Sequence, residues 1–587
     1  MARWITKETD ANIPLMAETL KINPILCEIL ANRGIRSKNS ATKYLNPSLK
    51  YMQDIRQMKD AEMACGIIIK GISEGKKFCI YGDYDVDGVA GTVIMHKTLS
   101  RLGADCYYYI PHREHEGYGL NIAAVDKIGA VSDILITVDN GISAVAEVAR
   151  AKELGLTVII IDHHEPQEEP EGKESLPNAD AIIDPKQSGC GYPFKEMSAA
   201  GIVYRFASLL HEACGKDFDI ADEALIFAAI AAFCDVVDLV DENRILAKGG
   251  LALLNSKTSP NVGLNALVKA RKLEYNKIGT FDIGFIIGPC INAAGRLESA
   301  ETAAELFLCN DEKRAAELAA KLVELNDKRK EMTANFVEKT IAEVSEKELD
   351  KVLVIYHPDI HESIAGIVAG RIKDALNRPA VVFTKAEGNV AKGSARSIEQ
   401  YNIFEEMQKV KELFIRFGGH KMAAGASLAY ENIDILRKKL NEACTLEEED
   451  FVPIIYIDKE LALDDITFDF AQSLNVLQPF GKANKQPVFV TKEIYTQNAE
   501  IIGQSGNTLR LSFRLENGRL IKAVAFKSVE KFAKLLENNY SQEVCEGFLS
   551  GRIRNLTIKM DIAYHIEINE WNGNSSLQLR ILDFNYS

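Results

Sequence analysis

The chain has 587 residues, enough for three or four domains of about 100–200 residues each. Its 47% hydrophobic and 26% charged residues are typical of a globular protein, and its longest apolar run, residues 224–234, is too short to span a bilayer. The net charge of −15 excludes a protein that coats nucleic acid over its whole surface, although residues 485–587 carry 13 basic and 11 acidic residues.

The cysteines and the first residues indicate the cellular compartment in which the protein is expected. Eleven scattered cysteines, without a Cys-x-x-Cys pair, favour a reducing environment over a disulfide scaffold. The first eight residues lack the apolar core of a signal peptide. The sequence therefore predicts a cytoplasmic protein that does not associate with a membrane.

Residues 1–75 are predicted to form a helical N-terminal segment. Apolar residues recur at helical spacing over residues 15–33 and 61–72. No residue pattern in this segment indicates chemistry.

The pattern between residues 76 and 245 alternates between short apolar runs and helical stretches. Such alternation predicts a parallel, doubly wound α/β sheet whose ligand site lies beyond the carboxyl ends of the strands. The predicted strands are residues 78–81, 106–110, 134–138, 157–161 and 181–183.

Three aspartates, Asp83, Asp85 and Asp87, follow the first predicted strand at alternate positions. Carboxylates this close repel one another strongly, and a bound divalent cation would relieve the repulsion. A solvated acidic turn is the alternative on composition alone. A generic calcium loop is a weaker one, because its Gly-x5-Glu continuation is missing after Gly88.

Other strand and helix ends also terminate in aspartate or histidine. A single aspartate there is most simply a helix N-cap, but the repetition favours a metal site. The imidazoles suit Mn²⁺ or a similar ion better than Ca²⁺. The residues are Asp139, Asp162, His163, His164, Asp184 and Asp235.

A long helix is predicted over residues 300–347, followed by a second α/β unit over residues 350–445. That unit contains the glycine-rich stretches 393–397 and 417–425. Glycines allow close backbone approach, and the adjoining Ser, Arg and His side chains can bind phosphate oxygens, although glycine turns are common.

From about residue 453 the pattern predicts strands, among them residues 509–515, 521–526, 547–553 and 562–568, and the last hundred residues fit a small barrel of the OB type. Aromatic residues such as Phe513, Phe526 and Tyr564 lie near basic residues and either stack on bases or form the barrel core.

Several motifs together resemble the DHH phosphoesterase superfamily and, within it, the RecJ family of single-strand-specific exonucleases. The resemblance covers nearly the whole chain. Its motifs are Asp-Tyr-Asp-Val-Asp-Gly at 83–88, Val-Asp-Asn-Gly at 138–141, Asp-His-His at 162–164, Cys-Asp-Val-Val-Asp-Leu at 234–239, Gly-Pro-Cys-Ile-Asn-Ala-Ala-Gly-Arg-Leu at 288–297 and Gly-Gly-His-Lys-Met-Ala-Ala-Gly at 418–425.

The resemblance implies two α/β domains, DHH and DHHA1, joined by a long helix and followed by an OB-type β-barrel. The implied division is a helical segment 1–75, a DHH catalytic domain 76–300, a connecting helix 301–348, a DHHA1 domain 349–446 and a nucleic-acid-binding OB domain 453–587.

The implied activity is 5′→3′ exonucleolytic hydrolysis of single-stranded DNA to 5′-mononucleotides, with two Mn²⁺ or Mg²⁺ ions, in recombination and repair. A helicase and a single-strand-binding protein are implied partners of a monomeric enzyme. The implied metal ligands are Asp83, Asp85, Asp87, Asp139, His163 and Asp235, with Asp83 the weakest match to the superfamily. His164 and Asp162 are implied to act in catalysis.

The implied substrate-binding residues are Arg113, Arg296, Ser394, Arg396 and His420. One position departs from the family pattern, because Cys290 stands where an arginine is usual, which predicts the loss of one contact to the strand. Two alternatives remain. One is a phosphoesterase of the same superfamily that acts on small substrates (an oligonucleotide, pAp or a cyclic dinucleotide), and the other is a non-catalytic DNA-binding scaffold.

Overall fold

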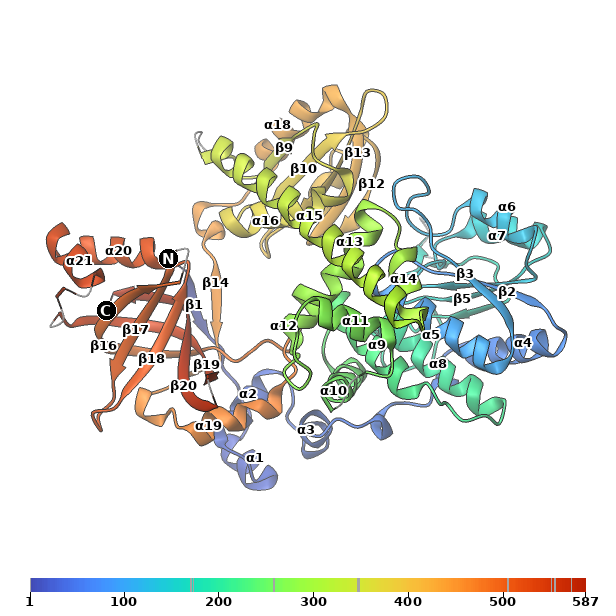
Figure 1. Ribbon diagram of the computed structural model, residues 1–587. Coiled ribbons are helices and arrows are strands. Elements are labelled where there is room, and N and C mark those ends of the chain that lie inside the picture. Colours follow the sequence, from blue (N-terminus) through green and yellow to red (C-terminus); the bar gives the residue numbers. More distant parts are fainter. Residues whose placement is uncertain are drawn as a thin grey trace. The chain divides into compact units, whose positions relative to one another are not determined.

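The computed structural model describes residues 2–168, 172, 174–256, 259–345, 349–503, 506–550, 552–553, 556–571 and 573–586 (Figure 1). The chain divides into two compact units. The larger unit contains residues 47–447 and 481–483, and the smaller unit contains residues 1–46, 448–480 and 484–587.

Five of the described strands of the larger unit form a parallel sheet in the order β3-β2-β4-β5-β8. All five predicted strands are thus confirmed. The order changes direction between β2 and β4, and ligands of such sheets bind beyond the strand ends at this point. The strands are β2 (Lys77–Tyr81), β3 (Asp105–Tyr109), β4 (Ile134–Val138), β5 (Thr157–Ile161) and β8 (Ala181–Ile183).

Helices cover both faces of this sheet, which explains why β4, Ile-Leu-Ile-Thr-Val, is buried throughout. On one face lie α4 (Ala61–Ser73), α5 (Val86–Leu102) and α8 (Ala199–Ala213), and on the other lie α6 (Ile122–Gly129) and α7 (Val145–Glu153). The remaining helices of this part are α9 (Ala221–Cys234), α10 (Asp241–Ser256), α11 (Val262–Ala270), α12 (Thr280–Asp282), a π-helical turn (Ile283–Ile287), α13 (Gly288–Leu297) and α14 (Glu301–Leu308).

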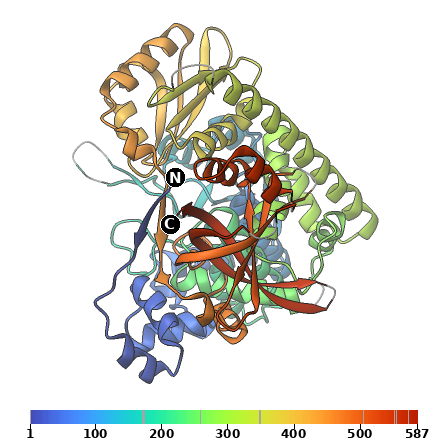
Figure 2. The same ribbon diagram turned by 90° about the vertical axis from the view of Figure 1, so that its left-hand side faces the viewer.

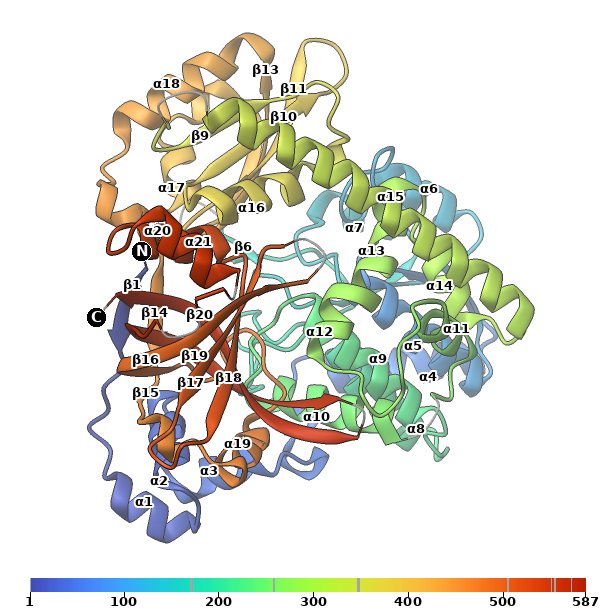
Figure 3. The ribbon, with the colours of Figure 1, turned by 60° about the vertical axis from the view of Figure 1, so that its left-hand side comes forward.

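The long helix predicted over residues 300–347 is interrupted, because α14 ends at Leu308 and a second helix, α15 (Glu312–Ser345), begins after residues 309–311. Helix α15 runs from the first α/β part of the larger unit to the second (Figure 3). Its apolar stripe is divided between two cores. Leu318 and Leu322 are buried with the helices of the first part, whereas Met332 and Phe336 pack against the core of the second. The helix therefore connects the two parts by packing against both.

The second sheet of the larger unit has the order β12-β13-β11-β10-β9. Only β9 and β10 are parallel; the other pairings are antiparallel. The strands are β9 (Leu353–Tyr356), β10 (Ala380–Lys385), β11 (Val390–Arg396), β12 (Phe414–His420) and β13 (Ala423–Ala429), and the helices are α16 (Ala365–Leu376), α17 (Ile403–Gln408) and α18 (Ile433–Ala443).

The smaller unit is built on a sheet of order β15-β16-β17-β18-β20-β19. An additional pairing of β16 with β19 closes five of these strands into a ring, whose curved strands are visible in Figure 2. The elements are β15 (Lys459–Glu460), β16 (Phe489–Ile502), β17 (Thr508–Arg514), β18 (Leu520–Phe526), β19 (Ile558–Trp571), β20 (Asn574–Tyr586), α19 (Phe468–Ser473), α20 (Val529–Glu537) and α21 (Gln542–Leu549).

The segment predicted as one helical piece, residues 1–75, lies in both units. Its first part contains α1 (Ile13–Leu20), α2 (Pro24–Asn32), α3 (Lys38–Leu45) and β1 (Arg3–Thr6), which pairs with β14 (Ile454–Ile457). Leu26 and Leu30 of α2 share a core with residues of the strand ring, and this shared core explains why residues 1–46 group with the C-terminal strands.

The predicted strand at residues 547–553 was wrong, because α21 extends to Leu549. The apolar residues Cys545 and Phe548 are both buried. Their spacing of three residues puts them on one side of a helix, and a short apolar run does not distinguish this pattern from a strand.

Candidate metal centre and phosphate pocket

The first acidic cluster lies between β2 and α5. Asp83 follows the end of β2, Asp85 is the N-cap of α5, and Asp87 lies in the first turn of that helix. Gly88 is required by packing, because a Cβ there would lie 2.6 Å from the backbone nitrogen of Asp83. Oδ1 of Asp85 accepts hydrogen bonds from the backbone N–H groups of Asp87 (2.9 Å) and Gly88 (3.1 Å). Asp85 therefore caps the helix and still presents a second oxygen to the cluster.

The backbone positions the side chains of Asp87 and Asp139. The carboxylate of Asp87 accepts hydrogen bonds from the N–H groups of Ala199 (2.7 Å) and Ala200 (2.8 Å), the first residues of α8, where the helix dipole stabilises an anion. Asp139 follows β4 with φ of 64°, a left-handed conformation that aspartate tolerates better than most residues. This turn directs its side chain toward the cluster at the switch point.

The six predicted metal ligands come together at the carboxyl ends of β2, β4 and β5 and of helix α9. Nε2 of His163 lies 3.2 Å from Oδ1 of Asp139, 3.7 Å from Oδ2 of Asp87 and 3.8 Å from Oδ2 of Asp235. Three sets of potential ligand atoms lie within 4.8 Å of one another: Asp83, Asp85 and Asp139; Asp87, His163 and Asp235; and Asp139, His163 and His164.

Electrostatics shows how unfavourable this cluster is without a cation. Burial, followed by the neighbouring carboxylates, raises the pKa values of Asp83, Asp87 and Asp139 well above the ordinary range. Burial and then Asp85 raise the pKa of Asp235 to about 7. Burial, followed by the charge of His164, lowers the pKa of His163 to about 3, so His163 is a neutral imidazole.

The donor set fits a divalent cation. Oδ1 of Asp83 and Oδ1 of Asp139 are buried and accept no hydrogen bond from any described residue. Buried polar atoms are rarely left without a partner, and these two point into a cluster of further carboxylates and a neutral imidazole. Carboxylate oxygen with imidazole nitrogen is a ligand set for Mn²⁺ or Mg²⁺, and Asp139 and His163 each belong to two of the three sets.

Asp162 and His164 form an ordered pair beside the cluster. Oδ1 of Asp162 lies 2.7 Å from Nδ1 of His164, and Oδ2 accepts a hydrogen bond from the N–H of Ile142 at 2.9 Å. Burial is the largest influence on both groups and opposes their charge, but their mutual hydrogen bond and the nearby opposite charges together outweigh it. The pKa of His164 is therefore raised to about 9, and that of Asp162 is lowered. With Nδ1 engaged, Nε2 of His164 faces Tyr118, 3.2 Å from its hydroxyl.

The predicted substrate-binding residues Arg113, Arg296, Ser394 and Arg396 line one pocket of about 900 Å³ between the two α/β parts of the larger unit. Arg113 lies over the ring of Tyr84 at 4.8 Å. Arg296 donates a hydrogen bond to the carbonyl of Ser363 at 2.6 Å. Nη1 of Arg396 donates to Oγ of Ser394 at 2.8 Å, which fixes the guanidinium against β11.

The pocket favours an anion. Burial and then Arg113 lower the pKa of Arg296 to about 10, and the same two causes lower that of Arg396. Gly366 and Ile367, in the first turn of α16, also line the pocket, and a helix N-terminus presents free N–H groups to anions. Cations that repel one another beside a helix N-terminus are typical of a phosphate site.

Two predicted positions lie elsewhere. His420 is the last residue of β12, and it is not among the described residues that line this pocket. It lies near the pocket, because it pairs with Ala423 on β13, and Ala423 pairs on its other side with Arg396. Cys290 is fully buried, and its Sγ lies 3.5 Å from Nδ2 of Asn326 on α15. The side chain at position 290 faces the connecting helix and contacts no strand site among the described residues, and the predicted effect of losing the arginine stays a prediction.

Sequence reasoning missed Tyr118, Asn292, Lys392 and Arg416. Asn292 lies within the motif at 288–297, and its Oδ1 accepts a hydrogen bond from the N–H of Val86 at 3.1 Å. This hydrogen bond holds the acidic loop in place. Tyr118 lies five residues after Arg113, and its hydroxyl contacts Nε2 of His164. Lys392 and Arg416 line the phosphate pocket next to the glycine-rich stretches, and no sequence signal distinguished them from other surface cations.

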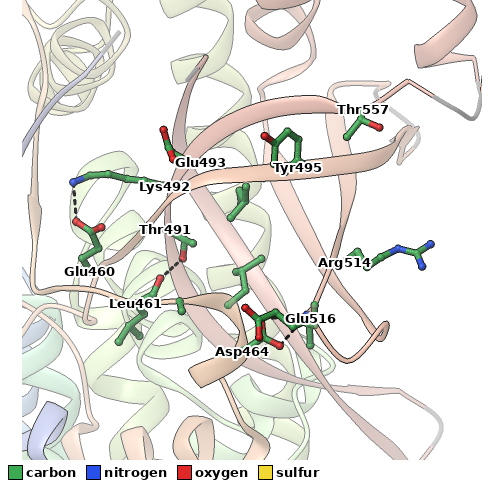
Figure 4. A pocket seen from close by; sticks show the side chains of 14 residues that line it. Glu460, Leu461, Asp464, Thr491, Lys492, Glu493, Tyr495, Arg514, Glu516 and Thr557 are labelled. Carbon is green, nitrogen blue, oxygen red and sulfur yellow. Dashed lines mark hydrogen bonds and ion pairs between the residues drawn. The ribbon is translucent and has the colours of Figure 1, made fainter.

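The smaller unit contains a separate pocket of about 750 Å³ lined by β15, β16 and the end of β17 (Figure 4). Lys492 pairs with Glu460 at 2.7 Å, and Asp464 accepts a hydrogen bond from the N–H of Glu516 at 3.0 Å. Carboxylates outnumber cations in its lining, so this pocket is unsuited to a phosphate backbone. Of the aromatic residues considered for base stacking, Phe513 and Tyr564 are fully buried in the core, whereas Phe526 is exposed.

Family models match the three parts of the chain in order. They are the DHH family N-terminal domain over residues 77–232, the DHHA1 domain over residues 349–446 and the RecJ OB domain over residues 457–583. Together with the carboxylate and histidine cluster, these matches define a protein of the DHH class.

Full-length relatives narrow this class. The chain is 36% identical to the single-stranded-DNA-specific exonuclease RecJ of Bacillus subtilis, over 99% of this chain and 70% of that protein. It is 32% identical to the protein of the same description from Haemophilus influenzae, over 95% and 96% of the two chains. The chain therefore belongs to the RecJ family.

A solved structure agrees with this assignment. The crystal structure of RecJ in complex with Mn²⁺ from Thermus thermophilus is similar to this one with a TM-score of 0.81 and 26% identity, covering all of this chain and 79% of that chain. The structure of the same protein with Mg²⁺ has a TM-score of 0.75 and 25% identity.

No helix among the described residues is long and apolar enough to cross a membrane.

Proposed function

We propose that this protein is a metal-dependent exonuclease specific for single-stranded DNA, which hydrolyses the strand from its 5′ end and releases 5′-mononucleotides. The observation that carries the proposal is the joint presence of a cation-requiring carboxylate and histidine cluster and an anion pocket in one unit of a RecJ-family chain. The cluster supplies hydrolysis, and the pocket supplies recognition of a phosphorylated end.

The proposed metal ligands are Asp83, Asp85, Asp87, Asp139, His163 and Asp235, and the proposed ions are Mn²⁺ or Mg²⁺. When bound, two such ions activate water and stabilise negative charge on the attacking and leaving oxygens of a phosphodiester. Asp83 is supported here as strongly as the other ligands, because its buried Oδ1 has no other partner among the described residues.

His164 and Asp162 act as a pair in this proposal. The hydrogen bond from Nδ1 to Asp162 fixes the ring, so Nε2 is the nitrogen that donates to an oxygen of the scissile phosphate. Asp162 is a positioning residue, because its two oxygens are already engaged by His164 and the backbone. Tyr118 limits the rotation of the same imidazole.

The phosphate pocket explains the proposed polarity. Arg113, Ser394 and Arg396 would bind the 5′-phosphate, and Arg296 and His420 would contact the strand nearby. Hydrolysis adds water to the first internucleotide phosphorus and breaks its bond to the 3′ oxygen. The product is a 5′-mononucleotide with a 3′ hydroxyl, and the shortened strand carries a new 5′-phosphate that can occupy the same pocket.

The proposed domains are a helical segment 1–75, a catalytic domain 76–300, a connecting helix 301–348, a DHHA1 domain 349–446 and a nucleic-acid-binding domain 453–587. The family-model matches at residues 77–232, 349–446 and 457–583 support the catalytic, DHHA1 and nucleic-acid-binding domains. The grouping of residues 1–46 with the smaller unit favours a further boundary inside the first segment.

The proposed setting is recombination and repair in the cytoplasm. A monomer suffices, because one chain contributes both the cluster and the pocket. An enzyme limited to single strands requires another protein to open duplex DNA, which supports cooperation with a helicase, and a single-strand-binding protein would present the strand.

The small-substrate and scaffold alternatives are less favoured. A small phosphoester needs no OB domain, yet such a domain matches residues 457–583. A non-catalytic scaffold does not need buried carboxylates whose pKa values are raised. Such a cluster of carboxylates lowers the stability of the fold and does not serve DNA binding.

One set of substrates distinguishes these functions. The purified protein with Mn²⁺ is given a labelled single strand, the matching duplex and a dinucleotide, and an Asp139→Asn variant is the control. We expect rapid hydrolysis of the single strand, little of the duplex and none by the variant, which still binds the strand. Preference for the dinucleotide would support the small-substrate alternative, and an inactive parent that binds DNA would support a scaffold.

A further inference from the structure

One face of the second sheet carries three rows of residues across β11, β13 and β12. Directly opposed residues of neighbouring strands point to the same face, and successive rows are about 6.7 Å apart. The register gives the rows as Lys392, Ser427 and Arg416; Ser394, Gly425 and Gly418; and Arg396, Ala423 and His420. The first two rows and Arg396 line the phosphate pocket.

The middle row contains two glycines that neither the backbone nor the packing requires. A Cβ at Gly418 or at Gly425 would meet no heavy atom within 4 Å, and neither residue has a left-handed φ. A glycine in a strand costs about 0.5–1 kcal/mol relative to alanine. Open space above paired glycines is therefore best explained by a ligand that lies directly on the backbone.

The pocket contains one cation that the contacts proposed so far do not use. Among the described lining residues there are five cations, Arg113, Arg296, Lys392, Arg396 and Arg416, and one carboxylate, Glu362. Arg113 and Arg396 are assigned to the 5′-phosphate, Arg296 is assigned to the strand, and Lys392 pairs with Glu362, which leaves Arg416. A terminal monophosphate carries a charge of about −1.5 to −2 at neutral pH. The chain as a whole is acidic, with a net charge of −15, so this concentration of cations is local.

The row of Lys392, Ser427 and Arg416 is placed to bind further negative charge. Arg416 is exposed; its backbone pairs with Ser427, but its side chain makes no hydrogen bond or ion pair with another described residue. Lys392 lies two strands away on the same row and pairs at 3.1 Å with Glu362. Ser427 between them adds a hydroxyl. Together they place two cations and a hydroxyl one row from Ser394, whose hydroxyl belongs to the proposed site of the 5′-phosphate.

We propose that the row of Arg416, Ser427 and Lys392 binds the outer phosphates of a 5′-triphosphate, so that the enzyme accepts strands with triphosphorylated 5′ ends. This inference rests on the proposed exonuclease function. The glycine row is the floor over which the polyphosphate extends from Ser394 to Arg416.

The consequence is a distinct first product. Water adds to the first internucleotide phosphorus, the bond to the 3′ oxygen breaks, and the terminal residue leaves as a nucleoside 5′-triphosphate with a 3′ hydroxyl. The remaining strand then carries an ordinary 5′-phosphate. A reaction that starts chains de novo from a nucleoside triphosphate is the class that supplies such ends.

The test compares thymidine oligomers that bear a 5′-hydroxyl, a 5′-monophosphate or a 5′-triphosphate. Affinities are measured by fluorescence anisotropy with EDTA present, so that the strand is not cleaved. We expect the triphosphate to bind about tenfold more tightly than the monophosphate, as one additional charge-assisted contact allows. Arg416→Gln should remove this gain, so that the affinities for the monophosphate and the triphosphate lie within about twofold of each other.

Lys438→Gln is the matched control, because Lys438 is an exposed cation of α18 in the same domain that does not line the pocket. Melting temperatures of both variants report on folding. Equal binding of the mono- and triphosphate by the parent protein would overturn the proposal. So would an equal loss for both ligands in Arg416→Gln, which would place Arg416 on the strand itself. If the proposed function were wrong instead, the monophosphorylated strand would not be hydrolysed with Mn²⁺.

Discussion

Replacing Asp139 by asparagine should have opposite effects on stability in the absence and presence of Mn²⁺. Asparagine keeps the shape of the side chain and tolerates the φ of 64° at this position, so the change removes only the charge. The carboxylate is 3% exposed and lies within 4.8 Å of the ligand atoms of Asp83 and Asp85. Two ionised carboxylates at that distance repel by about 3 kcal/mol at an effective dielectric constant of 20.

Part of this repulsion is already relieved by the raised pKa values of the cluster. We therefore expect the metal-free variant to gain about 1–2 kcal/mol in free energy of unfolding. The parent protein should gain about 2.7 kcal/mol when Mn²⁺ is present at a hundred times its dissociation constant, and the variant should gain much less.

The assay is thermal unfolding of both proteins with EDTA and over a series of Mn²⁺ concentrations. Asp105→Asn, at the exposed start of β3, is the control for a change of one charge. A metal-free variant less stable than the parent, or an unchanged stabilisation by Mn²⁺, would refute the reasoning that the cluster is built around a cation.

Three further outcomes are expected. Arg396→Gln should reduce the preference for 5′-phosphorylated over 5′-hydroxyl strands by about 10- to 100-fold in a competition assay, and an unchanged preference would refute its role. Cys290→Ala should leave the affinity for single strands within about twofold by anisotropy, since Sγ faces Asn326; a large loss would restore position 290 to the strand site. His565 is buried and donates from Nδ1 to the carbonyl of Pro487 at 2.6 Å, and burial lowers its pKa. The unfolded chain binds a proton near pH 6.5 and the folded chain does not, so stability should fall as the pH drops below about 6.5, and His565→Gln should weaken this dependence in denaturant titrations at pH 7.5 and 5.5.

The parallel sheet and the cluster were accessible from the sequence for a physical reason. Strands buried on both faces are continuous apolar runs, and the polar residues that follow them must meet at one edge of the sheet. Asp139 and His163 are 24 positions apart, yet they follow adjacent strands, and their side chains lie 3.2 Å apart.

Other features depended on packing that no local pattern contains. Residues 1–46 join the smaller unit through a core shared with distant strands, and α21 buries its apolar residues at helical spacing within a run too short to classify. The packing of Cys290 against α15 could not be predicted, because a helix presents a residue to one side only and the sequence does not show which side faces α15. Arg416 became a candidate only when the register set it opposite Ser427 and Lys392.

The most direct test of the central claim follows one DNA single strand that carries a radioactive 5′-phosphate and a dye at its 3′ end, incubated with the protein and Mn²⁺. We expect the 5′ label to be released first, as a mononucleotide, while the 3′ dye stays on a steadily shortening strand. Release of the 3′ dye first, or internal cleavage into long fragments, would contradict it.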